Sequence, residues 1–173
     1  MTDRRFKIAE INALACEAFV DIFGDVAEHS PWVARAAYGF HPFSSREDVI
    51  AAFEQGMKLA DHAQCLELIQ AHPDLAGKAA LAGAIAEDSR QEQAGAGLDT
   101  LTADEFARFT DLNTRYRAKF DFPFIFAVKG ATKTMILAAF EERIENSQEE
   151  EFAMALRQIA RIFRFRLEDR IEA

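Results

Sequence analysis

Residues 148–170 read QEEEFAMALRQIARIFRFRLEDR and contain the longest helical pattern in the chain. Apolar side chains recur there every three or four residues, at Phe152, Leu156, Ile159 and Phe163, which places them on one face of a helix. The spacing predicts one helix from about Gln148 to Arg170. Arg166 continues the same face, so we expect an inward-facing guanidinium that requires a carboxylate or an anionic ligand as its partner.

Other segments repeat this pattern, and the composition agrees with it. The chain has 173 residues, half of them hydrophobic and only four of them proline. These features favour an all-α protein, a compact bundle of roughly seven to nine helices, with residues 1–173 forming a single domain. Besides 148–170, the helices expected are 8–23, 30–37, 44–60, 61–70, 102–120 and one that begins at Thr132 or Thr134 and ends near Asn146.

Capping signals mark where several of these helices begin. Ser30 precedes Pro31 and is a possible N-cap. The Ser-x-x-Glu or Thr-x-x-Glu pattern of a capping box begins at Ser44, at Ser89 and at Thr102. Each of these positions is therefore a predicted helix start.

The charge and the cysteines restrict the functional class. A formal net charge of -9 argues against nucleic acid as the main partner, because phosphate binding needs clustered lysine and arginine. No segment resembles a membrane span or a secretory leader. Cys16 and Cys65 lack the spacing of metal ligands, and there is no His-Glu-x-x-His motif, so we expect no metal site. We expect a cytoplasmic protein with no membrane partner.

The segment FDFPFIFAVKG, residues 120–130, differs from the helices around it. Pro123 interrupts the aromatic run, and the run is too short for a core helix. An extended segment without a partner strand leaves backbone groups that need other partners. The segment therefore either lines a ligand site or is a buried connector held by neighbouring side chains.

Residues 70–98, QAHPDLAGKAALAGAIAEDSRQEQAGAGL, concentrate the remaining chemistry. Pro73 disfavours the helical conformation of His72, so His72 is expected in extended conformation at a helix end. Its imidazole either serves a site or is satisfied by a backbone group. Glu92 is either the third residue of a capping box or a functional carboxylate.

Five motifs in order along the chain make the sequence similar to one known family. They are Ser30-Pro31-Trp32-Val33-Ala34, His72-Pro73-Asp74-Leu75, Ser89-x-x-Glu92-Gln93 with Gly97-Leu98, Phe122-Pro123-Phe124-Ile125, and Arg166-Leu167. This combination resembles the 2-oxo-4-hydroxy-4-carboxy-5-ureidoimidazoline (OHCU) decarboxylases, which act in urate breakdown after hydroxyisourate hydrolysis.

The resemblance implies an all-helical decarboxylase, often dimeric, that uses no cofactor or metal and forms (S)-allantoin from OHCU. It further implies that His72 is catalytic and that Glu92 is its carboxylate partner. The residues that it assigns to substrate binding are Pro73, Ser89, Gln93 and Arg166, together with backbone groups of Phe124, Ile125 and Phe126. We expect a homodimer on the same grounds. Two alternatives remain open, a helical hydrolase of a neighbouring ureide and a non-enzymatic helical interaction module.

Overall fold

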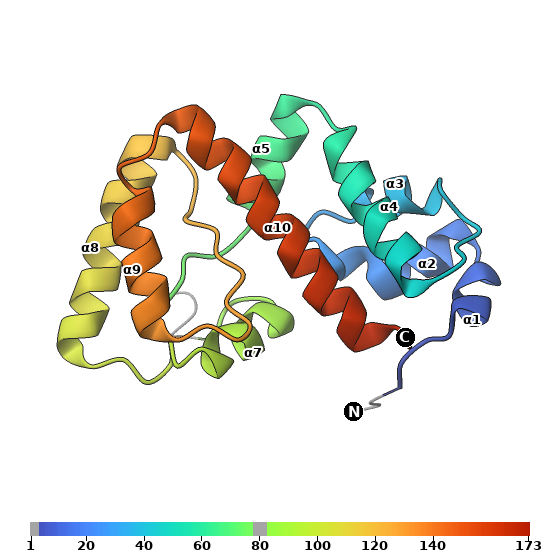
Figure 1. Ribbon diagram of the computed structural model, residues 1–173, viewed down its shortest axis with the longest axis horizontal. Helices are drawn as coiled ribbons and strands as arrows, with labels where there is room; N and C mark the ends of the chain where they lie inside the picture. Colours follow the sequence, from blue (N-terminus) through green and yellow to red (C-terminus); the bar gives the residue numbers. More distant parts are fainter. Residues whose placement is uncertain (1–3, 78–82) are drawn as a thin grey trace. The chain divides into compact units, whose positions relative to one another are not determined.

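The computed structural model describes residues 4–77 and 83–173 (Figure 1). Within those residues the regular structure is helical, and the only β-type pairing is an isolated bridge between Phe6 and Ile171. The all-α prediction is confirmed. The chain divides into two units, one of residues 1–71 and 160–173 and the other of residues 72–159.

The first unit is built around a cluster of phenylalanine rings. The rings of Phe19 and Phe53 lie 6.2 Å apart, and those of Phe53 and Phe163 lie 5.9 Å apart. α3 packs against α2 and α4 (Figure 1). Gly56 permits the close approach of α4, because a Cβ atom there would lie 3.1 Å from the side chain of Ala36. The elements of the first unit are α1 (Ile8–Asn12), α2 (Cys16–Phe23), the 3-10 helix η1 (Gly24–Val26), α3 (Trp32–Tyr38), α4 (Arg46–Lys58), α5 (His62–Gln70) and the last part of α10 (Gln148–Arg170).

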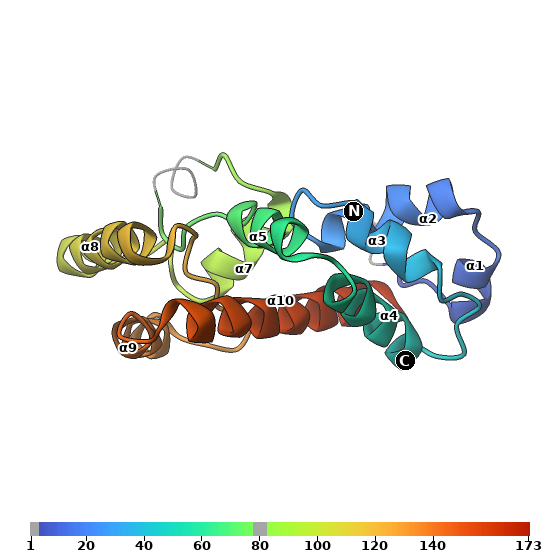
Figure 2. The ribbon, with the colours of Figure 1, turned by 90° about the horizontal axis from the view of Figure 1, so that it is seen from above.

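The second unit is organised around Tyr116, which is fully buried and contacts four phenylalanine rings. α8 and α9 lie side by side in both views (Figures 1 and 2). The helices of this unit are α7 (Glu87–Gly95), α8 (Ala103–Phe120), α9 (Lys133–Arg143) and the first part of α10. The predicted bounds of 148–170 are confirmed, and so is the capping box of Thr102 and Glu105.

The single helix predicted over residues 8–23 is wrong, because the chain breaks between α1 and α2. Tertiary contacts satisfy the polar groups at this break. The Asn12 amide donates to the Phe43 carbonyl at 2.8 Å, and the Tyr38 hydroxyl donates to the Leu14 carbonyl at 2.9 Å. Because these partners are distant in sequence, periodicity alone does not reveal the break.

Two predicted helix starts are shifted. α4 begins one residue later than the box predicted at Ser44, since Ser45 is the N-cap and its hydroxyl accepts from the Asp48 amide. Ser30 does not cap α3, because its hydroxyl donates to the Glu28 carbonyl at 2.8 Å. The helices themselves are present, so these errors concern only their first residues.

Candidate active site

His72 lies just after α5, in the non-helical position that Pro73 predicts. Its side chain is only 6% exposed. The chain then turns tightly through Ala76, a buried alanine with a left-handed φ of 53°. An alanine rarely adopts this conformation, so the surrounding contacts must hold the turn of residues 72–77 in place.

Side chains from α7 and α8 supply those contacts. The Gln93 amide accepts from the Ala76 backbone N–H at 3.0 Å and donates to the Asp74 carbonyl at 3.4 Å. The Asn113 amide donates to the Leu75 carbonyl at 2.9 Å. Gln93, expected at the substrate, therefore engages the turn that follows His72.

The capping box predicted at Ser89 does not form. α7 begins at Glu87 with Ala86 as its N-cap, three residues before the predicted cap, so Ser89 lies inside the helix and is buried. Acidic residues in the first turn favour this earlier start, because they interact with the positive end of the helix dipole. Glu92 is therefore not a capping residue. It is half-buried, and Glu92 and Gln93 lie three and four residues after Ser89, about one helical turn away.

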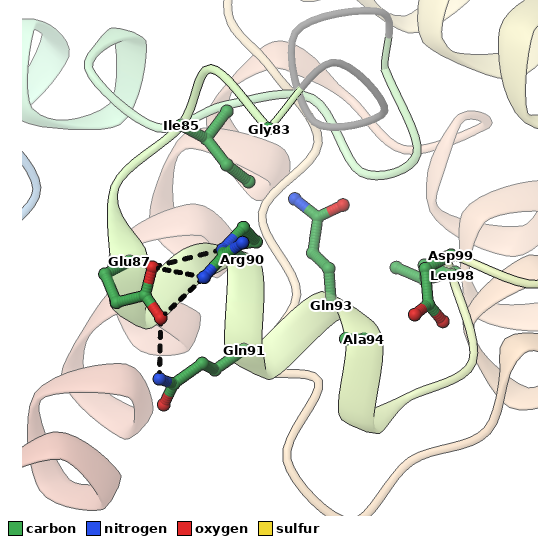
Figure 3. A pocket seen from close by; sticks show the side chains of 9 residues that line it. All are labelled: Gly83, Ile85, Glu87, Arg90, Gln91, Gln93, Ala94, Leu98 and Asp99. Atoms are coloured by element: carbon green, nitrogen blue, oxygen red, sulfur yellow. Dashed lines mark hydrogen bonds and ion pairs between the residues drawn. The ribbon is translucent and has the colours of Figure 1, made fainter.

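A cavity of about 460 Å³ lies beside α7 (Figure 3). Gln93 is the predicted site residue that lines it, and in the close-up its side chain points away from the helix toward the segment of Gly83 and Ile85. At the other end of α7, Arg90 and Gln91 hydrogen-bond to Glu87 and lower the pKa of that carboxyl. Gln93 thus borders both the cavity and the His72 turn.

The segment after α8 is irregular, as predicted, and its backbone is held by side chains. The Arg143 guanidinium donates to the Ile125 carbonyl at 2.7 Å, and the Ala127 amide N–H donates to Gln158 at 3.0 Å. The Phe124 ring stacks on Phe140 with 3.9 Å between ring centroids. Phe124 and Ile125 are buried, whereas Phe126 is partly exposed. The Ile125 carbonyl and the Ala127 N–H are therefore satisfied by neighbouring side chains, as expected of a buried connector.

A buried polar network anchors this segment. Arg143 donates to Glu151 at 2.9 Å, and the Tyr116 hydroxyl donates to the same carboxylate at 2.6 Å. Asn146 donates to its other oxygen at 3.0 Å. Burial raises the pKa of Tyr116, and the hydrogen bond to Glu151 raises it further. The hydroxyl therefore stays protonated in the folded protein.

Arg166 lies in the first unit, on α10, and is 4% exposed. Its Nη1 atom donates to the Val26 carbonyl at 3.2 Å and lies 3.4 Å from the carboxylate of Glu28, which is itself buried. The predicted inward guanidinium is confirmed. The other predicted site residues, from His72 to Phe126, belong to the second unit.

A family model described as OHCU decarboxylase matches residues 12–168. The chain belongs to the OHCU decarboxylase family. It is 38% identical over 166 residues to the 2-oxo-4-hydroxy-4-carboxy-5-ureidoimidazoline decarboxylase of Haloferax volcanii, and the matched residues cover 96% of each chain. It is 40% identical over 164 residues to the uric acid degradation bifunctional protein PucL of Bacillus subtilis, covering 95% of this chain and 32% of that protein. The resemblance inferred from the five motifs is confirmed.

A solved structure of this kind is also similar. The crystal structure of an (S)-allantoin synthase superposes with a TM-score of 0.78 at 30% identity, covering 96% of this chain and 54% of that one. A second crystal structure, of an OHCU decarboxylase in the presence of (S)-allantoin, matches with a TM-score of 0.69 at 23% identity, covering 85% of this chain and 94% of that one. The second likeness concerns the fold alone.

Several residues of this OHCU decarboxylase family member were missed by sequence reasoning. Asn113 lies four residues after Phe109 and three before Tyr116, so its place on the apolar face of α8 was visible in the sequence. Arg143 lies seven residues after Ile136 and three after Phe140, so its place on the buried face of α9 was visible in the same way, whereas Glu28 carried no such signal. Within residues 4–77 and 83–173, no three His, Cys, Asp or Glu side chains gather as metal ligands. None of the helices described there is both long and apolar enough to cross a membrane.

Proposed function

We propose that this chain decarboxylates OHCU to (S)-allantoin in urate degradation. The observation that carries the proposal is the family match over residues 12–168, together with near full-length similarity to a protein named for this reaction. The buried His72 supports it, because a histidine held away from bulk water suits controlled proton transfer. We further propose that the protein acts as a cytoplasmic homodimer without a cofactor.

The chemistry requires little beyond what these residue types provide. Loss of carbon dioxide from a carbon beside a ring C=N bond leaves an electron pair that this bond accepts. The substrate is therefore its own electron sink, and no pyridoxal or thiamine is needed. The protein must orient the heterocycle, place charge and move one proton.

His72 is the proposed proton carrier. It either takes the proton of the ring hydroxyl or delivers one to a single face of the developing enol-like intermediate. Glu92 orients the imidazole and adjusts its pKa.

The remaining roles follow the family resemblance. Arg166 and Gln93 hold the heterocycle and its ureido group, and Pro73 and Ser89 contact the substrate. Backbone donors of Phe124, Ile125 and Phe126 stabilise charge on a ring oxygen. Arg143 supports this last role, since its bond to the Ile125 carbonyl fixes the backbone from which those donors project.

The test generates OHCU in situ from urate and follows the circular dichroism of the product. Proton delivery in free solution favours neither face, so optical activity reports the enzyme. We expect wild type to form (S)-allantoin and His72→Ala to be slower by about 10²- to 10⁴-fold. His62→Ala is the matched control, because His62 is exposed at the start of α5.

Each alternative predicts a different result. A hydrolase would consume hydroxyisourate or allantoin and release no carbon dioxide from OHCU. An interaction module would leave the uncatalysed rate unchanged. Undiminished formation of (S)-allantoin by His72→Ala would exclude the role assigned to His72.

A further inference from the structure

The turn that follows His72 needs contacts from other parts of the chain to keep its backbone conformation. Ala76 occupies the left-handed region at φ 53° while almost fully buried. The turn is also tight, since a Cβ atom on Gly77 would lie 2.9 Å from Cβ of Asp74. A backbone in a rarely populated conformation persists only when neighbouring groups fix it.

Hydrogen bonds to this turn are described for the side chains of Arg117, Gln93 and Asn113, and they differ in how strongly they can hold its backbone. Arg117 pairs with Asp74 at 2.8 Å, but its side chain is 46% exposed, so water and salt weaken the pair. Gln93 bonds to Ala76 and Asp74 from α7. Asn113 is buried and donates to Leu75 at 2.9 Å, so its loss leaves a buried carbonyl without its partner.

Asn113 is also an unusual residue for its position. It lies on the buried face of α8 between Phe109 and Tyr116, both of which are fully buried. Its Oδ1 atom is buried and has no hydrogen-bond partner among the residues that the structure describes. An apolar side chain would avoid that orphaned acceptor, so packing alone does not explain an amide here. The group that the amide supplies is the Nδ2 donor.

We propose that Asn113 is a positioning residue, whose hydrogen bond to the Leu75 carbonyl fixes the turn from which His72 is presented. The inference rests on the proposed function for the role of His72, three residues before Leu75. Asn113 acts through the backbone and touches no reacting atom. Because α8 is anchored at Tyr116 by the bond to Glu151, the donor projects from a rigid element.

The decisive variant is Asn113→Asp, which keeps the shape and replaces the Nδ2 donor by an oxygen. A carboxylate oxygen repels the Leu75 carbonyl, so we expect kcat to fall by about 10- to 100-fold with little change in KM. As the pH falls the carboxyl gains a proton, and its O–H then donates to the carbonyl. The ratio of variant to wild-type kcat should therefore recover in acid.

Asn113→Ala separates this effect from other titrations. It lacks a donor at every pH, so its kcat should be low without recovery. Other charged groups lie near Asn113 or act in the proposed reaction: Asp74 in the turn, Arg117 on α8, and His72 and Glu92 in the site. Both Asn113 variants contain all four of these groups, so a difference between the variants comes from residue 113 itself. Equal losses in both variants at every pH would overturn the proposal, and so would wild-type kcat in either.

Asn12→Asp is the matched control in the first unit. The Asn12 amide also donates to a backbone carbonyl, that of Phe43 at 2.8 Å, but the turn it holds carries no proposed site residue. We expect lower thermal stability with unchanged kcat. A fall in kcat as large as that of Asn113→Asp would show general loosening and overturn the proposal.

A second measurement does not depend on the reaction. In histidine ring NMR, with His72 assigned by its loss in His72→Ala, the Asn113 variants should shift the His72 signals and Asn12→Asp should not. Far-UV circular dichroism confirms that each variant is folded. If wild type forms no (S)-allantoin, the proposed function fails while the NMR result still decides the role of Asn113, and unshifted His72 signals would overturn it.

Discussion

Each unit contains a buried arginine–glutamate pair, and the contacts described for the two pairs differ in length. In the second unit, Arg143 contacts Glu151 at 2.9 Å and the Ile125 carbonyl at 2.7 Å, and its guanidinium lies 4.3 Å from the centre of the Phe124 ring. In the first unit, the contacts of Arg166 with Val26 and Glu28 both use Nη1, at 3.2 and 3.4 Å.

The surroundings of Glu151 explain the role of Arg143. Both oxygens of Glu151 receive short bonds, from Tyr116, Asn146 and Arg143. The Glu151 carboxylate therefore has a structural role, because any movement of it would break several hydrogen bonds at once. The contacts described for Arg166 with Val26 and Glu28 are longer than those of Arg143 with Glu151 and the Ile125 carbonyl. Arg143 is therefore a structural residue, whereas the ligand-binding role of Arg166 stays a proposal from the family resemblance.

Arg143→Ala should have the largest effect. It leaves the carboxylate of Glu151 buried without its cation, which lowers the free energy of unfolding by about 3–5 kcal/mol. Urea denaturation followed by circular dichroism measures this. Arg115→Ala is the control, since its pair with Asp111 is exposed on α8 and should matter little. Equal midpoints for the two variants would contradict the assignment.

The double variant Arg143→Met with Glu151→Leu sharpens the same point. Replacing both partners of a buried ion pair by apolar residues is often neutral. Here we expect the loss to persist, because the Tyr116 hydroxyl and the Ile125 carbonyl would lose their partners. Wild-type stability in the double variant would show that the network matters less than its contacts indicate.

Arg166→Ala should come next, and its effect should fall mainly on substrate binding. Loss of a charged hydrogen-bonding group lowers kcat/KM by about 100-fold, or about 2.7 kcal/mol, chiefly by raising KM. Arg164→Ala is the control, because Arg164 lies at the surface of the same helix and pairs with Glu47 of α4 and with Glu168. If Arg166→Ala is destabilised as strongly as Arg143→Ala, Arg166 is structural.

The sequence predicted helices best where local signals agree. α8 has a capping box at Thr102, and α10 has a long apolar face that ends with the helix, so their bounds were predictable. Residues 8–23 carry a continuous apolar face too, yet contacts from Phe43 and Tyr38 interrupt it. The start of α7 was misplaced because Ser89 fits a capping pattern that the acidic first turn outweighs.

The candidate site likewise has features that local sequence signals predict and features that depend on tertiary contacts. The non-helical position of His72 follows from Pro73, and the inward Arg166 follows from helical spacing, so both were visible locally. The hydrogen bond from Asn113 joins residues 38 apart, and that from Tyr116 to Glu151 joins residues 35 apart. Such contacts appear only once the fold brings the helices together. The roles proposed for Ser89, Glu92 and Gln93 rest on family resemblance and stay predictions.

Tyr116→Phe should have the smallest effect among these variants, because the ring and its packing remain. It removes the 2.6 Å hydrogen bond to the charged Glu151, which contributes about 1.5–3 kcal/mol to the free energy of unfolding. Tyr38→Phe is the matched control in the first unit. Its hydroxyl donates to the neutral carbonyl of Leu14, so we expect a loss of about 1 kcal/mol.

The difference in unfolding free energy between wild type and Tyr116→Phe should depend on pH, because the Tyr116 hydroxyl is buried and bound to a carboxylate. Burial and Glu151 raise the pKa of Tyr116 in the folded state, whereas an unfolded tyrosine ionises near about pH 10. The stabilisation is therefore complete below about pH 10 and is lost as the pH rises above it, by up to about 1.4 kcal/mol per pH unit. The gap in unfolding free energy between wild type and Tyr116→Phe should narrow accordingly in urea titrations between pH 9 and 11. A gap that stays constant over this range would show that Tyr116 ionises as readily in the folded protein as in the unfolded chain, against the closed network assigned to the second unit.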